Sequence, residues 1–352
     1  IADSAGSDTL DFGALADTDP VTVDLNKADV ASHTNRAVTV TSGPLENVIG
    51  GAAGDDITAS SDDNTLAGGP GDDVYRFLDN FGAGNFVVEA ADEGTDTFDF
   101  SLVTTDLTFT IGSVIVTDAG GTVTHSDDNI EKLIGGDGDD IFLFSVDGVT
   151  LAGGNGTIDG GNGNDTLDYS GYTTVPVVIN LVDSTATGLD SFQNIEVFTL
   201  GGASDRLAGP NGVNDWQITG INEGTLNGSF AFSGVENLTG GSGVDTFTFA
   251  DGAGVTGTID GGSDNDVFDY SAYTSNVGVD LQNSAATGTA AFAGIEDFIG
   301  GTSTDTLTGF DADAGWNITG AGTGTVSAVA FAGFEHLIGG TGVDTFTFGI
   351  AG

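Results

Sequence analysis

The chain repeats itself, and this repetition limits the folds open to it more than any other feature. Residues 240–249 read GGSGVDTFTF, and residues 339–348 read GGTGVDTFTF, with one change in ten positions. The flanking segments are also near-copies, so the large repeat is about 100 residues long. Inside it, the aspartates of glycine-rich turns are spaced by one or two times about 20 residues. The pattern predicts an array of small equivalent units, each packed on its neighbours.

Each small unit has the pattern of β-structure. Polar and apolar residues alternate in Thr246-Phe247-Thr248-Phe249, which predicts a strand with Phe247 and Phe249 facing inward. A strand, a glycine-rich turn, a second strand and another turn make one coil of a parallel β-solenoid. We therefore predict an all-β fold, a parallel β-solenoid of the β-roll or β-helix kind, with coils of about 20 residues. The solenoid is expected to be continuous over residues 1–352, with approximate sub-units 1–95, 96–159, 160–259 and 260–352.

Both ends of the sequence read as interrupted repeats. Residues 1–3 fit the step that reads IDGG elsewhere, and residues 346–352 fit the segment that precedes such a step. Solenoids normally need polar caps over their end coils, and we expect this one to be uncapped at both ends. The sequence is therefore expected to belong to a longer tandem array, or to stack end to end with copies of itself.

The net charge excludes several partners. Asp and Glu number 53 against 5 Lys and Arg, for a formal net charge of -48, so nucleic acids and anionic lipid surfaces are poor partners. Apolar residues make up 38% of the chain, and their alternation with polar ones favours a folded β protein over an acidic tail. No apolar run approaches the roughly 18 residues of a membrane-spanning helix, so we expect no membrane insertion.

Catalysis needs a constellation of residues that occurs once, and this sequence distributes its polar residues by repetition. His33, His125 and His336 sit in unrelated contexts, and the carboxylate pair Asp165 and Asp168 recurs in other repeats. Cysteine is absent, which excludes disulfides and thiol chemistry. We therefore expect no enzymatic activity in this segment.

Five turns match the pattern G-G-x-G-x-D-x-apolar without a defect. They span residues 68–75, 135–142, 160–167, 240–247 and 339–346. The pattern resembles the RTX, or haemolysin-type, calcium-binding nonapeptide, and it is also similar to repeats of very large secreted bacterial surface proteins. The resemblance implies Ca²⁺ held by glycine carbonyls and aspartate carboxylates, a mixed oxygen shell that suits this ion. The ligands are then Asp56, Gly68, Gly69, Gly71, Asp73, Gly135, Gly136, Gly138, Asp140, Gly160, Gly161, Gly163, Asp165, Gly240, Gly241, Gly243, Asp245, Asp264, Asp266 and Asp344.

A single turn offers half of such a site, because in the RTX family each ion lies between two stacked turns. Aspartates one coil apart form three pairs, which are Asp56 with Asp73, Asp140 with Asp165, and Asp245 with Asp266. Asp344 would pair with a following repeat. The turns at residues 201–205, 261–266 and 300–305 depart from the motif, and Asp264 stands where Gly is expected. The alternative interpretation is that the motif only makes a corner, whose Asp accepts backbone N–H bonds.

A glutamate that follows an apolar residue also recurs, at Glu46, Glu131, Glu196, Glu236, Glu296 and Glu335. A turn Asp stands nine residues after each of the last five, whereas Asp56 stands ten residues after Glu46. Strict alternation breaks at this glutamate, which predicts a bend or bulge. Three roles are open: the glutamate caps backbone amides, faces solvent or binds metal. We favour the structural cap.

Two non-enzymatic functions remain. In the first, the chain is a structural repeat region of an extracellular adhesin, stalk or filament, ordered by calcium at its turns. In the alternative, it is a calcium-folded RTX-type module that accompanies a secreted enzyme or toxin elsewhere in the parent chain. The long super-repeat favours the first. We expect neighbouring repeats or end-to-end copies as partners, with cell-surface or matrix polysaccharide as a further candidate, and a secreted or cell-surface location in a bacterium.

Overall fold

The computed structural model describes residues 6–15, 19–34, 36–89, 94–112, 115–126 and 129–349. The predicted start of an interrupted repeat at residues 1–3 lies outside the described residues. Strands dominate, and the described residues form no α-helix, only the 3-10 turn η1 (Ala152–Gly154). The chain divides into two compact units, Ile1–Gly171 with Thr185–Val197, and Tyr172–Ser184 with Phe198–Gly352. Each unit is described by itself.

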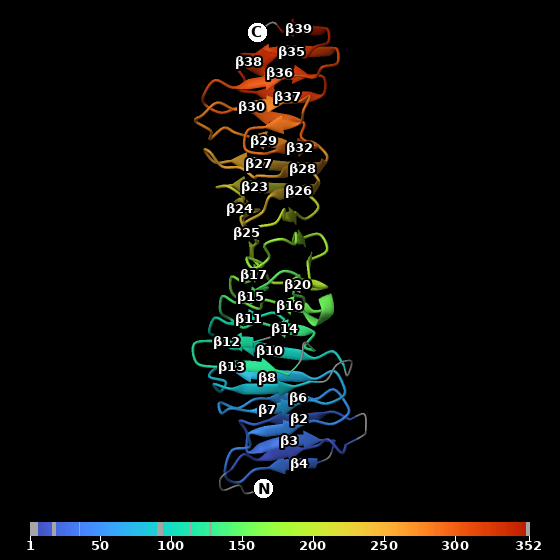
Figure 1. Cartoon of the computed structure of the whole chain (residues 1–352), viewed down its shortest axis with the longest axis vertical. Helices are drawn as coiled ribbons and strands as arrows, with labels where there is room; N and C mark the ends of the chain where they lie inside the picture. Colours follow the sequence, from blue (N-terminus) through green and yellow to red (C-terminus); the bar gives the residue numbers. More distant parts are fainter. Residues whose placement is uncertain are drawn as a thin grey trace. The chain divides into compact units, whose positions relative to one another are not determined.

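One sheet of the first unit has nine strands, most of them parallel (Figure 1). Their spatial order is β20 (Ser191–Gln193), β16 (Thr157–Asp159), β14 (Lys132–Ile134), β10 (Thr97–Leu102), β8 (Val74–Leu78), β6 (Asp56–Thr58), β2 (Val21–Asp24), β3 (Asp29–His33) and β4 (Arg36–Thr39). Neighbours from β20 to β2 are parallel, and β2, β3 and β4 form an antiparallel meander. Strands far apart in sequence thus lie side by side in one register.

A second ladder of strands lies in the same unit. Its spatial order is β1 (Thr9–Asp11), β5 (Asn47–Ile49), β7 (Thr65–Ala67), β9 (Asn85–Val88), β13 (Thr122–His125), β12 (Ile115–Thr117), β11 (Thr108–Thr110), β15 (Ile141–Leu143) and β17 (Thr166–Asp168). Among the described strands of this ladder, only β11, β12 and β13 pair antiparallel, as local hairpins inserted into an otherwise parallel ladder.

The second unit repeats this organisation. One ladder contains β23 (Asn214–Ile218), β24 (Glu223–Leu226), β25 (Phe230–Ser233), β27 (Asp245–Phe249), β29 (Val267–Asp269), β33 (Asp297–Ile299), β35 (Ala314–Gly320), β36 (Thr323–Val326), β37 (Val329–Ala332) and β39 (Asp344–Phe348). A parallel sheet holds β18 (Val178–Asn180), β22 (Arg206–Ala208), β26 (Asn237–Ser242), β28 (Thr258–Ser263) and β32 (Ala291–Ala293). A smaller sheet holds β31 (Ala285–Ala286), β30 (Gly278–Asp280), β34 (Thr306–Thr308) and β38 (His336–Ile338). Of the remaining strands, β19 (Thr185–Ala186) belongs to the first unit, and β21 (Val197–Thr199) begins at the last residue of the first unit and continues in the second.

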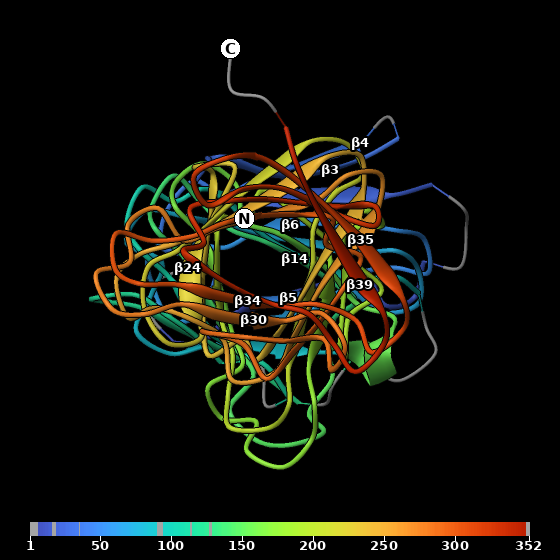
Figure 2. The ribbon, with the colours of Figure 1, turned by 90° about the horizontal axis from the view of Figure 1, so that it is seen from above.

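The core of each unit is a set of stacked side chains in register. Phe247 on β27 lies opposite Phe268 on β29, which lies opposite Phe298 on β33. Trp216 stacks on Phe247 with ring centroids 5.6 Å apart, and in the first unit Phe109 stacks on Phe142 at 4.5 Å. In the second unit, β30 and β34 are neighbouring parallel strands (Figure 2). Parallel register therefore places like residues on like residues.

The predicted all-β character is confirmed, as is the alternation in the strands after the turns. Phe247 and Phe249 are fully buried, while Thr246 and Thr248, which alternate with them, are partly exposed. Trp216 is buried too. In the described part of the chain no helical segment has the length and apolar character that crossing a membrane requires.

Candidate metal sites at the glycine-rich turns

The turn aspartates point into the protein, although the chain carries a net charge of -48. Each of them ends its turn directly before or at the first residue of a strand, which fixes the side chain at the corner. Nine of them are buried to 2% exposure or less: Asp55, Asp73, Asp96, Asp140, Asp165, Asp205, Asp245, Asp266 and Asp305. A buried carboxylate is unfavourable unless its oxygens find donors, so the partners of these nine decide what the turns do.

One oxygen of each carboxylate accepts a backbone N–H from the neighbouring turn. In the first unit the Asp55 N–H donates to Asp73 Oδ1 at 2.6 Å, and the Asp73 N–H donates to Asp96 Oδ1 at 2.9 Å. The same bond joins Asp140 to Asp165 at 2.7 Å. In the second unit, the Asp245 N–H donates to Asp266 Oδ1 at 2.7 Å. The aspartates therefore form ladders, which we call aspartate ladders, in which each side chain caps the amide of the turn before it.

At the end of each aspartate ladder, the repeated glutamate accepts the backbone N–H of the last aspartate. The Asp96 N–H donates to Glu131 Oε2, and the Asp266 N–H donates to Glu296 Oε2. All six repeated glutamates accept the N–H of a turn Asp or of Asp8 in this way, at 2.8 to 3.1 Å. The structural-cap interpretation of the repeated glutamate is thus confirmed.

The predicted bend beside this glutamate has a local cause. The residue two positions before the Glu has a left-handed φ in four repeats: 53° at Asn194, 71° at Gly234, 57° at Gly294 and 77° at Gly333. Asn and Gly are the residues that adopt this region most readily. The bend brings the apolar residue before the Glu into the core and turns the carboxylate back to the turn amide, as at Val235 and Glu236.

The second carboxylate oxygen is often left without a hydrogen bond. Among the described residues, the buried Oδ2 atoms of Asp73, Asp165, Asp205, Asp245 and Asp266 have no donor. Burial raises the pKa of Asp165 to about 7 and the pKa of Asp245 to about 6. An orphaned buried carboxylate oxygen calls for a proton or a cation.

Glycine at the start of each turn leaves room for this oxygen. At Gly240, a Cβ atom would collide with Asp245 Oδ2 and also with the carbonyl oxygen of Gly261 in the next turn. The same convergence recurs at Gly135, between Asp140 Oδ2 and the Gly160 carbonyl. A carboxylate oxygen and a carbonyl oxygen of neighbouring turns therefore meet at the space that a side chain would fill. This donor set fits Ca²⁺, which accepts mixed shells of carboxylate and carbonyl oxygens.

In the turn at residues 50–56, the buried aspartate is not the predicted Asp56. Asp55, not Asp56, is the buried aspartate of its turn: it accepts the Gly51 N–H at Oδ2, and a Cβ on Gly50 would meet it together with the Gly68 carbonyl. Asp56 begins β6, and its carboxylate pairs with Arg76 at 3.1 Å. The spacing from the repeated glutamate could have identified Asp55, because Asp55 stands nine residues after Glu46, as the turn aspartates do in the other repeats.

The turns that depart from the motif keep the same geometry. Asp205 and Asp305 accept the N–H groups of Val177 and Val277 at 2.8 and 2.7 Å. Asp264 is exposed, and its Oδ2 accepts the Gly243 N–H at 3.2 Å. The amide-capping role of the buried aspartate therefore does not require the complete motif.

The remaining predicted ligands occupy distinct places in their turns. Gly69, Gly71, Gly161, Gly163, Gly241 and Gly243 have φ between 93° and 133°, a region that side chains rarely adopt. Gly136 donates its N–H to Asp140 Oδ2 at 2.7 Å, and a Cβ on Gly138 would meet the backbone of Thr105 and Asp106. Asp344 is only partly buried. The structure thus brings three predicted turn pairs together, with Asp55 in place of Asp56.

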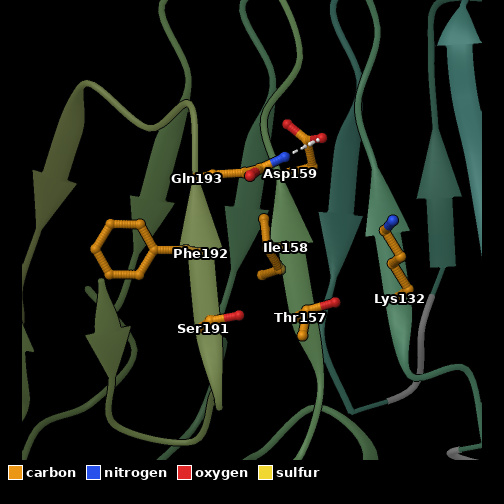
Figure 3. A pocket seen from close by; sticks show the side chains of 7 residues that line it. All are labelled: Lys132, Thr157, Ile158, Asp159, Ser191, Phe192 and Gln193. Atoms are coloured by element: carbon orange, nitrogen blue, oxygen red, sulfur yellow. Dashed lines mark hydrogen bonds between the residues drawn. The ribbon is translucent and has the colours of Figure 1, made fainter. Parts of the chain in front are cut away.

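A shallow hollow of about 220 Å³ lies on the outer side of β14, β16 and β20 (Figure 3). Lys132, Asp159 and Ser191 line it, and Gln193 donates a hydrogen bond to Asp159 at 2.6 Å. Ligand pockets usually have about 300 Å³ or more and a mostly apolar lining. The hollow is a furrow between side chains of parallel strands.

No protein-family model matches the chain, and comparison with curated proteins finds no significant match. Function is therefore inferred from the residues of the turns and from the strands that position them.

Proposed function

We propose that this chain is a structural repeat region, a parallel β-solenoid that forms the stalk, wall or filament of an extracellular bacterial surface protein and that calcium orders at its turns. The observation that carries the proposal is the aspartate ladder. The same buried carboxylate, capping the same amide and closed by the same glutamate, recurs along both units. Residues repeated in this way serve the scaffold, and length and stiffness are what such a scaffold offers.

The solenoid part of the proposal is supported by the registers. Parallel strands that are consecutive in space pair residue for residue, as Leu133 with Ile158 and Ile158 with Phe192. Parallel neighbours joined through turns and a second sheet are the arrangement that successive coils of a solenoid adopt. The hairpins β11–β12–β13, β23–β24–β25 and β35–β36–β37 are insertions in this scheme.

The calcium part is supported by the carboxylate and carbonyl oxygens that meet at the first glycine of each turn, a place that we call the glycine cradle. The residues that would hold the ion are Asp245 with the Gly261 carbonyl, Asp140 with the Gly160 carbonyl, and Asp55 with the Gly68 carbonyl. Of the three Oδ2 atoms, that of Asp245 has no hydrogen-bond donor among the described residues, whereas those of Asp140 and Asp55 each accept one backbone N–H. When bound, the ion supplies the positive charge that a buried carboxylate lacks. Because the two oxygens come from neighbouring turns, binding favours the stacked arrangement and so couples to folding.

Thermal melting of the full chain tests the calcium part. We expect a higher melting temperature in calcium than in chelator, measured by circular dichroism at equal ionic strength set with NaCl. Salt alone screens the repulsion among exposed carboxylates, so only the excess over NaCl reports a specific ion. Equal melting temperatures in the two matched solutions would contradict a role for calcium.

Electron microscopy tests the filament part. At high concentration in calcium, end-to-end stacking predicts particles longer than one chain. Single dispersed particles at every concentration would exclude stacking of separate chains and leave only repeats joined within one polypeptide.

A further inference from the structure

Three carboxylates meet inside the first unit, at a place that belongs to no single turn. Asp73 directly precedes β8, Asp96 directly precedes β10, and Glu89 directly follows β9 in the other ladder. All three side chains are at most 2% exposed. One oxygen from each lies within 4.8 Å of the other two. We call these three residues the carboxylate triad.

The Asp73 side chain points into the triad with an oxygen that has no partner. Its Oδ1 accepts the Asp55 N–H, and its buried Oδ2 has no hydrogen-bond donor in the described part of the chain. The Oδ2 atom packs on Gly68, where a Cβ would collide with it. The N–H of the same Gly68 points to Glu89 Oε1 at 3.3 Å, so the two carboxylates converge on one point.

Tyr75 adds a neutral group and no positive charge. Its hydroxyl donates to Glu89 Oε1 and accepts the Gly68 N–H. The nearest arginine in sequence, Arg76, points to the other face of β8, where it pairs with Asp56 and Asp99. Burial, with the charges of Glu89, Asp96 and Asp55, raises the pKa of Asp73 to about 8.

We infer that the carboxylate triad of Asp73, Glu89 and Asp96 binds one calcium ion in the interior of the first unit. Calcium–oxygen distances of about 2.3–2.6 Å put ligands on opposite sides of the ion up to about 5 Å apart, which matches the spread of the triad. Magnesium, at about 2.1 Å, needs a tighter and octahedral set. The all-oxygen donor set also disfavours metals that prefer nitrogen or sulfur.

This site is separate from the proposed turn sites. Those sites use the Oδ2 atom of Asp55, Asp140 or Asp245 and the carbonyl of the next turn. The triad instead uses Asp73 and Asp96 together with Glu89, which stands outside every repeat. The three ligands come from both strand ladders of the unit. The ion would therefore hold the two strand ladders together and also stabilise the stacking of neighbouring turns. Since the ligands are buried, we expect the ion to enter as the unit folds.

The test compares Glu89→Gln with Asp62→Asn in the full chain. Asp62 is exposed in the same unit, so its variant removes the same charge without touching the triad. Calcium titration calorimetry should show that Glu89→Gln loses the tightest ion or binds it weaker by about tenfold or more, while Asp62→Asn matches the natural sequence. In chelator, Glu89→Gln should melt higher than the natural sequence, because it relieves repulsion among buried carboxylates.

Equal calcium stoichiometry and affinity in Glu89→Gln and the natural sequence would overturn the inference. If Glu89→Gln does not fold, as judged by circular dichroism, Tyr75→Phe decides. Terbium replaces calcium and emits when a nearby tyrosine is excited, so loss of this emission in Tyr75→Phe supports the triad site, and unchanged emission contradicts it. Asp245→Asn should keep the triad ion, so this inference and the proposed turn sites fail separately.

Discussion

The second unit contains the same decapeptide twice, in two different surroundings. At residues 240–249, strand β27 lies between β23 and β29, and Asp245, Phe247 and Phe249 are all fully buried. At residues 339–348, strand β39 pairs with β35 and with no other described strand. There Phe346 is 39% and Phe348 74% exposed.

The turns differ in the same way. The Asp245 N–H donates to Asp266 Oδ1, and Asp245 Oδ2 meets the Gly261 carbonyl at the Gly240 cradle. At Gly339, the three atoms nearest to a Cβ all belong to Asp344 itself. The decapeptide therefore encodes the strand and the corner, and the neighbouring turn supplies the amide and the second oxygen. A motif of this kind is half of a site until its neighbour is in place.

The largest contrast is expected for the phenylalanines. Phe247→Ala should lower the free energy of unfolding by about 3–5 kcal/mol, because it leaves a cavity between Trp216 and Phe268. Phe346→Ala should cost clearly less, since the side chain is already 39% exposed. Urea unfolding followed by tryptophan fluorescence measures both. Equal losses would mean that burial by the neighbouring strand does not distinguish the two copies.

The glycines should give the next contrast. Gly240→Ala forces a methyl group against the Gly261 backbone, which cannot move without its turn, and should cost about 1–3 kcal/mol. Gly339→Ala meets only the partly exposed Asp344 side chain, which can rotate away, and should cost less than about 1 kcal/mol. Thermal melting of the two variants in chelator checks the difference. A larger loss in Gly339→Ala would contradict the role of the cradle.

The smallest effect on stability is expected for Asp245→Asn, and its sign differs with and without calcium. Asp245→Asn keeps an oxygen for the Asn214 N–H and places an amide donor beside the Gly261 carbonyl. In chelator above pH 7 it should therefore stabilise the protein by about 1 kcal/mol, and in calcium it should reduce the gain from the ion. Asp344→Asn is the matched control and should change neither value measurably. Melting curves of both variants in both solutions provide the comparison.

The sequence was sufficient for the strands and the corners because they depend on local pattern. Alternation placed Phe247 and Phe249 inward, and the fixed distance from the first glycine to Asp245 marked the corner. The capping role of the repeated glutamate was also favoured from the break in alternation, and Glu236 shows it.

Contacts between residues far apart in the chain could not be predicted from the sequence. The choice of Asp56 over Asp55 followed from the motif, which puts the aspartate two residues after the last glycine, whereas in the structure the buried Asp55 lies beside the next turn's carbonyl. Glu89 gave no signal at all, because it matches no repeat and approaches Asp73 only through pairing between β7 and β9. Spacing predicts which turns stack, and only the fold shows which side chains from the other ladder join them.

The pH dependence of stability tests the central claim most directly, because the claim is that buried turn carboxylates lack a positive partner. Burial raises the pKa of Asp140 and Asp245 to about 6 and that of Asp165 to about 7, above the usual aspartate value. A raised folded-state pKa gives stability that is complete below about pH 4 and is lost as pH rises through the folded-state value.

The measurement is the melting temperature of the full chain from about pH 4 to about pH 8, in chelator with matched NaCl and in calcium. The account predicts a fall with rising pH in chelator and a calcium-induced gain that grows over the same range, because the ion binds only deprotonated carboxylates. Parallel pH profiles in the two solutions, with a gain that does not depend on pH, would contradict it.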